Sequence, residues 1–245
     1  NNPGEFLSAA ERIEKILEEK GKEILIEEFL SGPEVALEGL LIGGHLHTLA
    51  LFDKPDPLEG PTFEETIYIT PSRFPGNIQS DVQTVVQKGC TALGLTEGPI
   101  HAEVRITPKG PHIIEIAARS IGGLCSQTLR FGTGVSLEEI ILRHAIGADL
   151  PTLSRESQSA GVMMIPIPRK GILEGVSGKE PAQEIPGIEG VSITAPLGTE
   201  IIPLPEGSRY LGFLFARGET PEQVERSLRK AHKHLRFEIR TKDSG

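Results

Sequence analysis

The segment GPIHAEVRITPKGPHIIEIAARSIGG, residues 98–123, predicts two short β-strands, a tight turn between them and a glycine-bearing loop after them. From Ile100 to Ile106 apolar and polar residues alternate, which is typical of a strand with one buried face. The more apolar run Pro111–Ala117 predicts the second strand. If residues 108–110 form a three-residue loop with Gly110 in the left-handed conformation, the two strands pair as a hairpin.

In that hairpin Glu103 and Glu115 face each other. Two carboxylates directly across a ladder repel and destabilise it. A divalent cation between them reverses the effect, because hard cations such as Mg²⁺ bind carboxylate oxygens together with substrate phosphates. Arg119 follows four residues later and could place a phosphate-binding guanidinium nearby. A solvated hairpin edge that carries these charges by chance is the alternative, and spacing does not separate the two.

Composition excludes several classes of protein. The chain has 245 residues, of which 38% are hydrophobic and 24% charged, and no apolar run approaches the ~20 residues of a membrane span. With a net charge of −9 and 4% aromatic residues, we expect neither nucleic-acid nor membrane partners. Cys90 and Cys125 have no metal-ligand spacing and indicate buried thiols in a reducing, cytoplasmic compartment.

The distribution of charge along the chain and a polar linker predict two units. Residues 1–150 carry 12 Lys+Arg and 22 Asp+Glu, whereas residues 151–245 carry 13 and 12. A polar linker begins at Pro151, so we expect one unit over residues 1–152 and a second over 160–245. In the second, short apolar segments separated by Gly and Pro predict a small antiparallel sheet or barrel, followed by one helix capped at Thr220.

The first unit is expected to mix helices and strands. An amphipathic helix with one buried stripe is predicted from Asn2 to Lys20, capped by Asn2 and ended by Gly21. A strand is predicted over residues 23–29, and a further helix over 76–93. The chain is therefore assigned to the α+β class.

Acidic residues gather on the next predicted strand, Glu34–Ile42. Glu34 and Glu38 share one of its faces, which forms either a solvated edge or the polar wall of a cleft. The following turn-rich stretch, residues 53–61, suits a flap over a site. Its Lys54 could contact a phosphate or carboxylate, or could be an ordinary exposed lysine.

Taken together, residues 1–150 resemble the ATP-grasp superfamily, most closely its L-amino-acid ligase branch. The motifs that carry the resemblance are IEEFLSGPE (26–34), TALGL (91–95), GPIHAE (98–103) and IEIAARSIGG (114–123). Residues 160–240 look like the small C-terminal domain of these ligases, with YLGFLFARG (210–218) as the best match. The implied fold is an ATP-grasp C-terminal lobe, an antiparallel sheet flanked by helices, followed by a small mainly-β domain with one helix.

The resemblance implies an ATP-dependent reaction. ATP phosphorylates a carboxylate to an acyl phosphate, which an amine then attacks; the substrates are expected to be amino acids. Glu103 and Glu115 would hold Mg²⁺ against the phosphates. Arg119 would stabilise the transferring phosphoryl group. This chemistry depends on positioning and charge neutralisation more than on covalent catalysis.

The resemblance also implies where nucleotide and substrate bind. The adenine would meet a hinge through backbone groups of four residues: Glu27, Glu28, Phe29 and Leu30. Glu34 would approach the ribose hydroxyls, and Glu38 would reach the ammonium of an amino-acid substrate.

Two departures from the family pattern qualify this picture. Many members have Asn two residues after the second metal carboxylate, where this chain has Ala117; one of two Mg²⁺ ions would then bind less tightly or through water. The family's preceding domain, phosphate-binding lysines and glycine-rich loop are also not found before Asn2. We therefore expect this chain, as the C-terminal part of a ligase, to bind nucleotide weakly at most and to show no turnover alone.

Two other interpretations stay open. Within the superfamily, a carboxylase-type or purine-biosynthetic enzyme would share the hairpin. Outside catalysis, the chain could be a binding or oligomerisation module, which Ala117 favours. The oligomeric state is open, with a homodimer as one option.

Overall fold

The computed structural model describes residues 2–17, 23–58 and 64–241. The chain divides into two compact units, residues 1–30 and 31–245, and each is described by itself. In the first, helix α1 spans Pro3–Leu17, and the Oδ1 atom of Asn2 accepts the Glu5 N–H at 3.0 Å, which confirms the predicted cap. No residue of α1 is buried, so the predicted buried stripe is wrong. The predicted helix end at Gly21 lies outside the described residues.

The predicted strand over residues 23–29 is also wrong. The segment has no regular secondary structure, and Leu25 and Ile26 are exposed. A strand is defined by ladder hydrogen bonds, and none of the described residues pairs with this segment.

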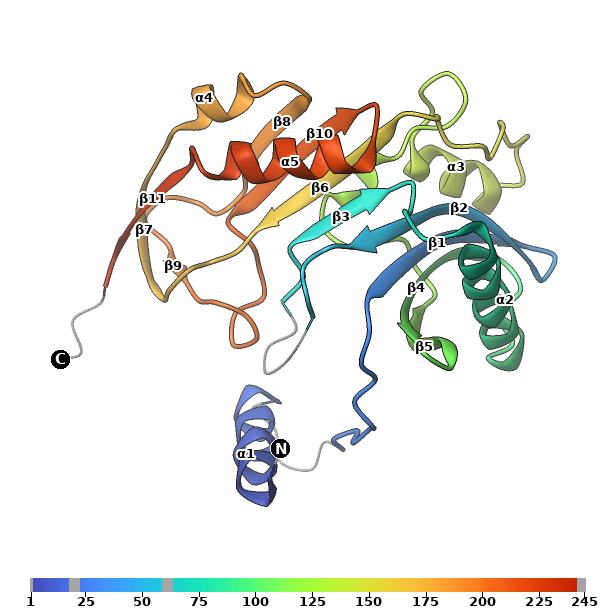
Figure 1. Ribbon diagram of the computed structural model, residues 1–245, viewed down its shortest axis with the longest axis horizontal. Coiled ribbons are helices and arrows are strands. Elements are labelled where there is room, and N and C mark those ends of the chain that lie inside the picture. The colour runs from blue at the N-terminus through green and yellow to red at the C-terminus, as the bar shows by residue number, and fades with distance from the viewer. Residues whose placement is uncertain (1, 18–22, 59–63, 242–245) are drawn as a thin grey trace. The chain divides into compact units, whose positions relative to one another are not determined.

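The larger unit is built on one eight-stranded sheet, with the order β5-β4-β1-β2-β3-β6-β10-β8 (Figure 1). Neighbouring strands run antiparallel. The strands are β1 (Glu34–Ile42), β2 (His45–Lys54), β3 (Ile67–Thr70), β4 (Gly98–Thr107), β5 (Gly110–Ala117), β6 (Ser159–Ile165), β8 (Ile188–Ile193) and β10 (Gly212–Gly218).

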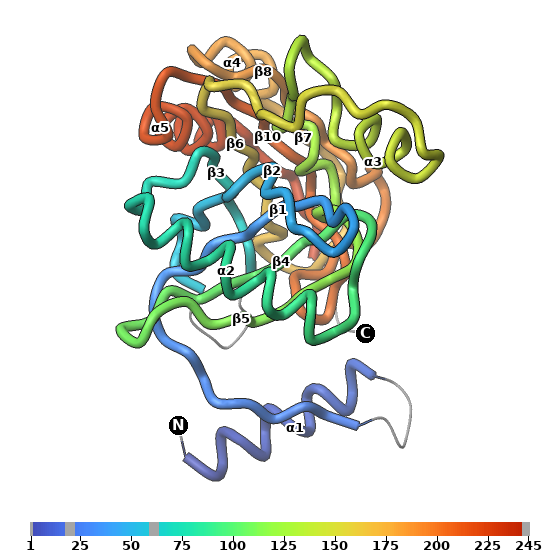
Figure 2. The backbone as a smooth tube through the Cα atoms, turned by 90° about the vertical axis from the view of Figure 1, so that its right-hand side faces the viewer, coloured from blue at the N-terminus to red at the C-terminus, as the bar shows by residue number. Residues whose placement is uncertain are grey.

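Helices cover both faces of this sheet (Figures 1 and 2). Helix α2 (Gly76–Ala92) packs with the Val35 face of β1, and α5 (Pro221–His232) packs on β3, β6 and β10. The 3₁₀ helix η1 (Cys125–Thr128) and helix α3 (Leu137–Ala145) pack with the Ala36 face of β1. Since alternate strand residues point to opposite faces, Glu34 and Glu38 share the Ala36 face, as predicted.

The sheet is continuous across the predicted linker, because β3 pairs with β6. Residues 31–245 therefore pack as one compact unit, and the predicted separate sheet for residues 160–245 is wrong for β6, β8 and β10. A three-stranded sheet of that region, in the order β11-β7-β9, comprises β7 (Gly171–Ser177), β9 (Glu200–Ile201) and β11 (Arg236–Arg240). Besides the predicted helix α5, whose Thr220 cap is confirmed, this region contains the short helix α4 (Lys179–Gln183). The α+β class is confirmed.

The predicted hairpin of β4 and β5 forms, but with a different turn. Thr107 pairs with Gly110, so the loop has two residues instead of the predicted three, and Gly110 has φ +105°. A register shift between Glu103 and Val104 then adds one residue on β5. The shorter loop and the bulge offset each other, and Glu103 lies opposite Glu115 as predicted.

Candidate active site

Strand pairing arranges charges of opposite sign on the Ala36 face of the sheet. Glu34 of β1 lies opposite Lys54 of β2 and Arg105 of β4, and Glu38 lies opposite His101 of β4. Directly opposed residues in antiparallel strands are close enough for their side chains to interact. The polar face of the strand that begins at Glu34 is therefore the wall of a charged site and not a solvated edge.

Lys54 lies at the centre of this site. Its Nζ donates to Glu34 Oε1 at 2.6 Å, also bonds Glu65, and lies 3.1 Å from Glu103 Oε1. The residue is only 7% exposed, and Nζ lies 5.1 Å from the centre of the Tyr68 ring. The predicted loop over residues 53–61 is thus wrong at its start, where Lys54 ends β2. Residues 59–61 of that loop lie outside the described residues.

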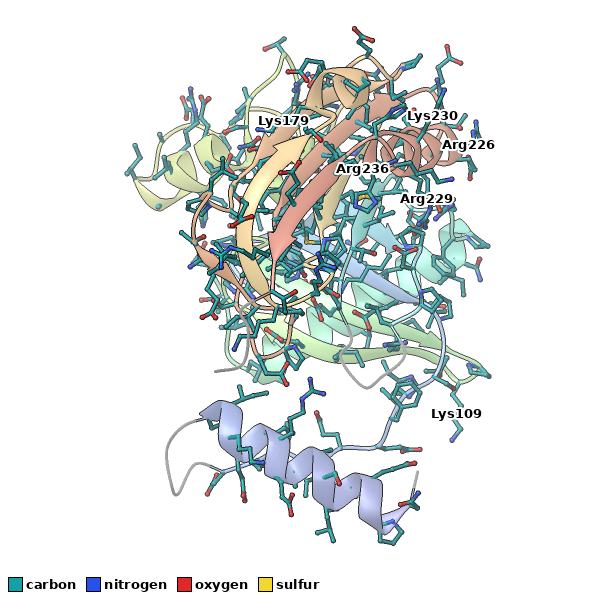
Figure 3. The ribbon with its side chains drawn as sticks, turned by 90° about the vertical axis from the view of Figure 1, so that its left-hand side faces the viewer. Lys109, Lys179, Arg226, Arg229, Lys230 and Arg236 are labelled. Carbon is teal, nitrogen blue, oxygen red and sulfur yellow. The ribbon has the colours of Figure 1, made fainter. Side chains whose placement is uncertain are left out.

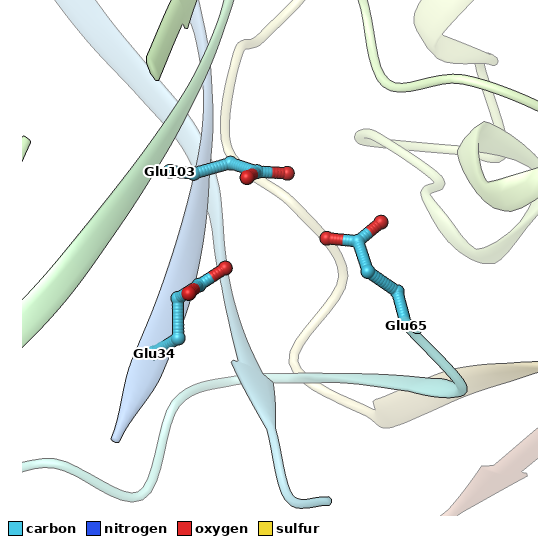
Figure 4. Close-up of side chains that lie close together, drawn as sticks. All are labelled: Glu34, Glu65 and Glu103. Atoms are coloured by element: carbon cyan, nitrogen blue, oxygen red, sulfur yellow. The ribbon is translucent and has the colours of Figure 1, made fainter. Parts of the chain in front are cut away.

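The three carboxylates around Lys54 form a compact donor set. Oxygen atoms of Glu34, Glu65 and Glu103 lie within 4.8 Å of one another, and their side chains point toward a common centre (Figure 4). Carboxylate oxygens are the ligands that Mg²⁺ and Ca²⁺ prefer. The chemistry of the donor set therefore fits a hard divalent cation.

Mutual contacts shift the pKa values of these groups. Burial lowers the pKa of Lys54, but Glu65, Glu103 and Glu34 outweigh it and leave the pKa above its usual value. Burial raises the pKa of Glu103, but His101 and Lys54 outweigh it and hold the pKa well below its usual range. At neutral pH Lys54 is therefore cationic and Glu103 is ionised.

His101 joins Glu103 to the loop that follows β5. Its Nδ1 bonds Glu38, and its Nε2 lies 3.5 Å from Glu103 Oε1. The second oxygen of Glu38 accepts the backbone N–H of Ile121 at 3.1 Å. Burial lowers the pKa of His101, but the two carboxylates outweigh it and raise the pKa to about 9. The buried imidazolium of His101 thus links Glu103, through Glu38, to the backbone of Ile121 in the loop after β5.

Glu115 and Arg119 lie in a more open environment. Both side chains are 57% exposed, and Arg119 Nη2 lies 3.9 Å from Glu115 Oε1. Arg119 Nη1 also donates to the carbonyl of Ser120 at 3.0 Å. Glu115 is not one of the three carboxylates that meet at Lys54, so the two predicted metal residues share a rung of the hairpin but have different surroundings.

The chain matches the models of two known families. The ATP-grasp domain model matches residues 2–128, just over half of the chain. The chain belongs to the ATP-grasp family. A second model, L-amino acid ligase C-terminal domain 2, matches residues 163–240. The resemblance inferred from sequence is therefore confirmed, and the two models match on either side of the linker predicted at 152–160.

Relatives of this ATP-grasp chain are larger than the chain itself. The crystal structure of an L-amino acid ligase from Bacillus licheniformis superimposes with a TM-score of 0.85 at 27% identity, over 98% of this chain and 62% of that one. Dapdiamide A synthase of Enterobacter agglomerans is 32% identical over 127 residues, 49% of this chain and 29% of the relative. Carnosine synthase 1 of Gallus gallus is 29% identical over 148 residues, 59% of this chain and 16% of the relative. The chain thus spans less than two thirds of each.

The other predicted residues of the ATP-grasp site fall in two places. Glu34 and Glu38 are buried in the charged site. The predicted hinge residues Glu27–Leu30 belong to the first unit, where Glu27, Glu28 and Phe29 are exposed.

The described helices include none with the length and apolar character that a membrane span requires.

Sequence reasoning missed Glu65 and His101. The alternation of β4 places His101 on the same face as Glu103, and this was the available signal. Glu65 precedes β3 in an irregular stretch, so no periodicity marks it. Its approach to Glu34 and Glu103 depends on the order of β1, β2, β3 and β4 in the sheet.

Proposed function

We propose that this chain provides the metal- and nucleotide-binding half of an ATP-dependent ligase that joins a carboxylate to an amine, with amino acids as substrates. The observation that carries the proposal is the convergence of Glu34, Glu65 and Glu103 oxygens within 4.8 Å. Of these three residues, Glu103 shares its rung of the hairpin with Glu115. The match to the L-amino acid ligase C-terminal model supports amino acids over other substrates.

The reaction has two steps. An oxygen of the substrate carboxylate attacks the γ-phosphorus of ATP, and the bond to the β-γ bridging oxygen breaks, which gives an acyl phosphate and ADP. The amine nitrogen then attacks the acyl carbon, phosphate leaves, and the nitrogen loses a proton as the amide forms. Both steps depend on charge neutralisation and alignment of the reactants.

Mg²⁺ supplies the neutralising charge when it is bound. Glu103 and Glu115 are its proposed ligands, and the oxygens of Glu34 and Glu65 extend the donor set on the buried side. Ala117 offers no side-chain oxygen, which makes a second ion weaker or water-mediated. An all-oxygen set of this kind suits Mg²⁺, which keeps several waters and substrate phosphates in its shell.

The remaining roles concern the nucleotide and the transferring group. Arg119, exposed beside Glu115, stabilises the phosphoryl group through its planar donors. Backbone groups of Glu27–Leu30 receive the adenine, and Lys54 contacts a phosphate. For Glu34 we propose a place in the metal donor set instead of the expected contact with the ribose, because its two oxygens are paired with Lys54 and Arg105.

For Glu38 we propose a positioning role in place of the expected contact with a substrate ammonium. The residue is 1% exposed, and its two oxygens are bonded to His101 and Ile121.

Mn²⁺ binding in the presence of ADP, followed by electron paramagnetic resonance, tests the proposal. Glu103→Gln and Glu115→Gln are expected to weaken metal–nucleotide binding at least tenfold, because each removes a charged ligand. Glu174→Gln, at an exposed β7 carboxylate, is the matched control and should bind as the unmodified chain does. Unchanged metal–nucleotide binding in both site variants contradicts the proposal.

The two other interpretations predict different results. A non-catalytic module predicts that Glu103→Gln and Glu115→Gln stabilise the chain and change no ligand binding. A carboxylase-type enzyme predicts a carboxylated product, whereas the proposed ligase gives a dipeptide or a related amide. Mass spectrometry of the products that the full-length enzyme forms from amino-acid mixtures distinguishes them.

A further inference from the structure

The charged site contains its own cation at the point where the carboxylate oxygens converge. Lys54 Nζ lies 2.6 Å from Glu34 and 3.1 Å from Glu103 and also bonds Glu65. These three residues are the same set whose oxygens lie within 4.8 Å of one another. The ammonium thus occupies the position that the donor set offers to a divalent ion.

The carboxylates of this site are already paired with positive groups. Arg105 Nε lies 2.7 Å from Glu34 Oε2, and His101 approaches Glu103 at 3.5 Å. A divalent ion added beside a buried ammonium would be repelled strongly, since like charges a few ångströms apart interact over little solvent. Entry of the ion therefore requires one resident cation to leave.

Lys54 is the cation best able to leave. Arg105 is also anchored by backbone carbonyls, to Gly32 at 2.8 Å and to Leu58 at 2.7 Å, and His101 is held by Glu38. The Lys54 ammonium contacts carboxylates and the Tyr68 ring, and it is carried on a flexible four-carbon stem. A surface cavity of about 240 Å³, lined in part by Lys54, Glu34 and Pro55, adjoins it.

We propose that the Lys54 ammonium is a tethered counter-ion that holds Glu34, Glu65 and Glu103 together and leaves them when a divalent cation binds. The inference rests on the proposed function. In this exchange, one bound ammonium is replaced by one divalent ion. The released lysine is then free to contact the anionic group that accompanies the metal, so the charge that had blocked the site becomes a phosphate contact.

Mn²⁺ alone, titrated into the 245-residue chain, tests the exchange. Lys54→Met removes the competing charge and should tighten Mn²⁺ binding on the order of tenfold, whereas Lys54→Arg retains a cation and should show no gain. Lys109→Met is the matched control, because Lys109 is an exposed residue of the β4–β5 turn (Figure 3). Equal or weaker Mn²⁺ binding by Lys54→Met than by the unmodified chain overturns the proposal.

Lysine acetylation of the unmodified chain provides a second test that does not depend on a folded variant. Lys54 should react slowly without metal, because it is 7% exposed, and should react several-fold faster at saturating Mn²⁺, while Lys109 and Lys230 keep their rates. Continued protection of Lys54 at saturating Mn²⁺ refutes the exchange. Glu103→Gln distinguishes failure of the exchange from failure of the proposed metal site. If Glu103→Gln abolishes metal binding while Lys54→Met has no effect, the metal site is supported and the exchange is refuted.

Discussion

Glu103 and Glu115 face each other on one rung of the β4–β5 hairpin, yet they differ in exposure and in their charged neighbours. Glu103 is 20% exposed and lies within reach of Lys54 and His101. Glu115 is 57% exposed and has a loose contact with Arg119. The pKa of Glu103 is held well below its usual range. Two glutamates on the same rung therefore have different surroundings.

The difference follows from the places of the two strands in the sheet. β4 lies between β5 and β1, and Glu103 lies beside Lys54 of β2 and His101 of β4. β5 is an edge strand of this sheet, so within the described part of the chain Glu115 has a strand neighbour on one side only. Strand order, and not the hairpin, therefore decides which of the two carboxylates lies among other charged groups.

The largest expected effect concerns the imidazolium on the Glu103 side. The pKa of His101 is raised from 6.5 to about 9, so its stabilisation is complete below pH 6.5 and is lost as pH rises to 9. We expect the free energy of unfolding to fall by about 3 kcal/mol over this interval. Urea unfolding at a series of pH values measures it.

His101→Gln should remove that pH dependence, because glutamine does not titrate. His47→Gln, at an exposed position of β2, is the control and should retain the fall. If His101→Gln loses stability with pH as steeply as the unmodified chain, His101 is not the group responsible, and the Glu103 side is less distinctive than proposed.

The next effect compares the two carboxylates directly. Glu103→Gln leaves Lys54 and His101 short of a counter-charge, and we expect a loss of about 2 kcal/mol, below the ~3–5 kcal/mol of a fully buried pair, because its side chain is 20% exposed. Chemical denaturation at pH 7 measures the change. A gain in stability would instead indicate that the carboxylates around Lys54 are mutually repelling surface charges.

Glu115→Gln should change the free energy of unfolding by no more than about 0.5 kcal/mol, since an exposed ion pair contributes little. The same denaturation experiment applies. The two substitutions are thus expected to differ in stability but to agree in weakening metal–nucleotide binding. A loss above about 1 kcal/mol for Glu115→Gln would remove the contrast.

The smallest expected effect is at Arg119. Arg119→Lys keeps the charge but not the bidentate fork, so stability should be unchanged within about 0.5 kcal/mol. Binding of ADP with Mn²⁺ should weaken by a few-fold, which electron paramagnetic resonance measures. If the affinity for ADP with Mn²⁺ is unchanged, the contact of Arg119 is limited to the transferring phosphoryl group, which ADP lacks.

Much of this protein was determined by local sequence. The alternation in residues 100–106, the Pro and Gly residues of the turn, and the capping residues Asn2 and Thr220 predicted elements that the structure contains. The rung shared by Glu103 and Glu115 was predicted correctly although its turn was not, because a two-residue loop and a bulge have the same net register as a three-residue loop.

Tertiary structure alone decided which of these residues meet. The predicted strand at residues 23–29 does not form, since pairing requires a partner that local propensity cannot supply. Lys54, expected in a loop, became the centre of the site because β2 extends beside Glu34, and Glu65 joined it although no sequence pattern marks it. Periodicity is a property of one segment, whereas the site depends on how β1, β2, β3 and β4 are ordered in the sheet.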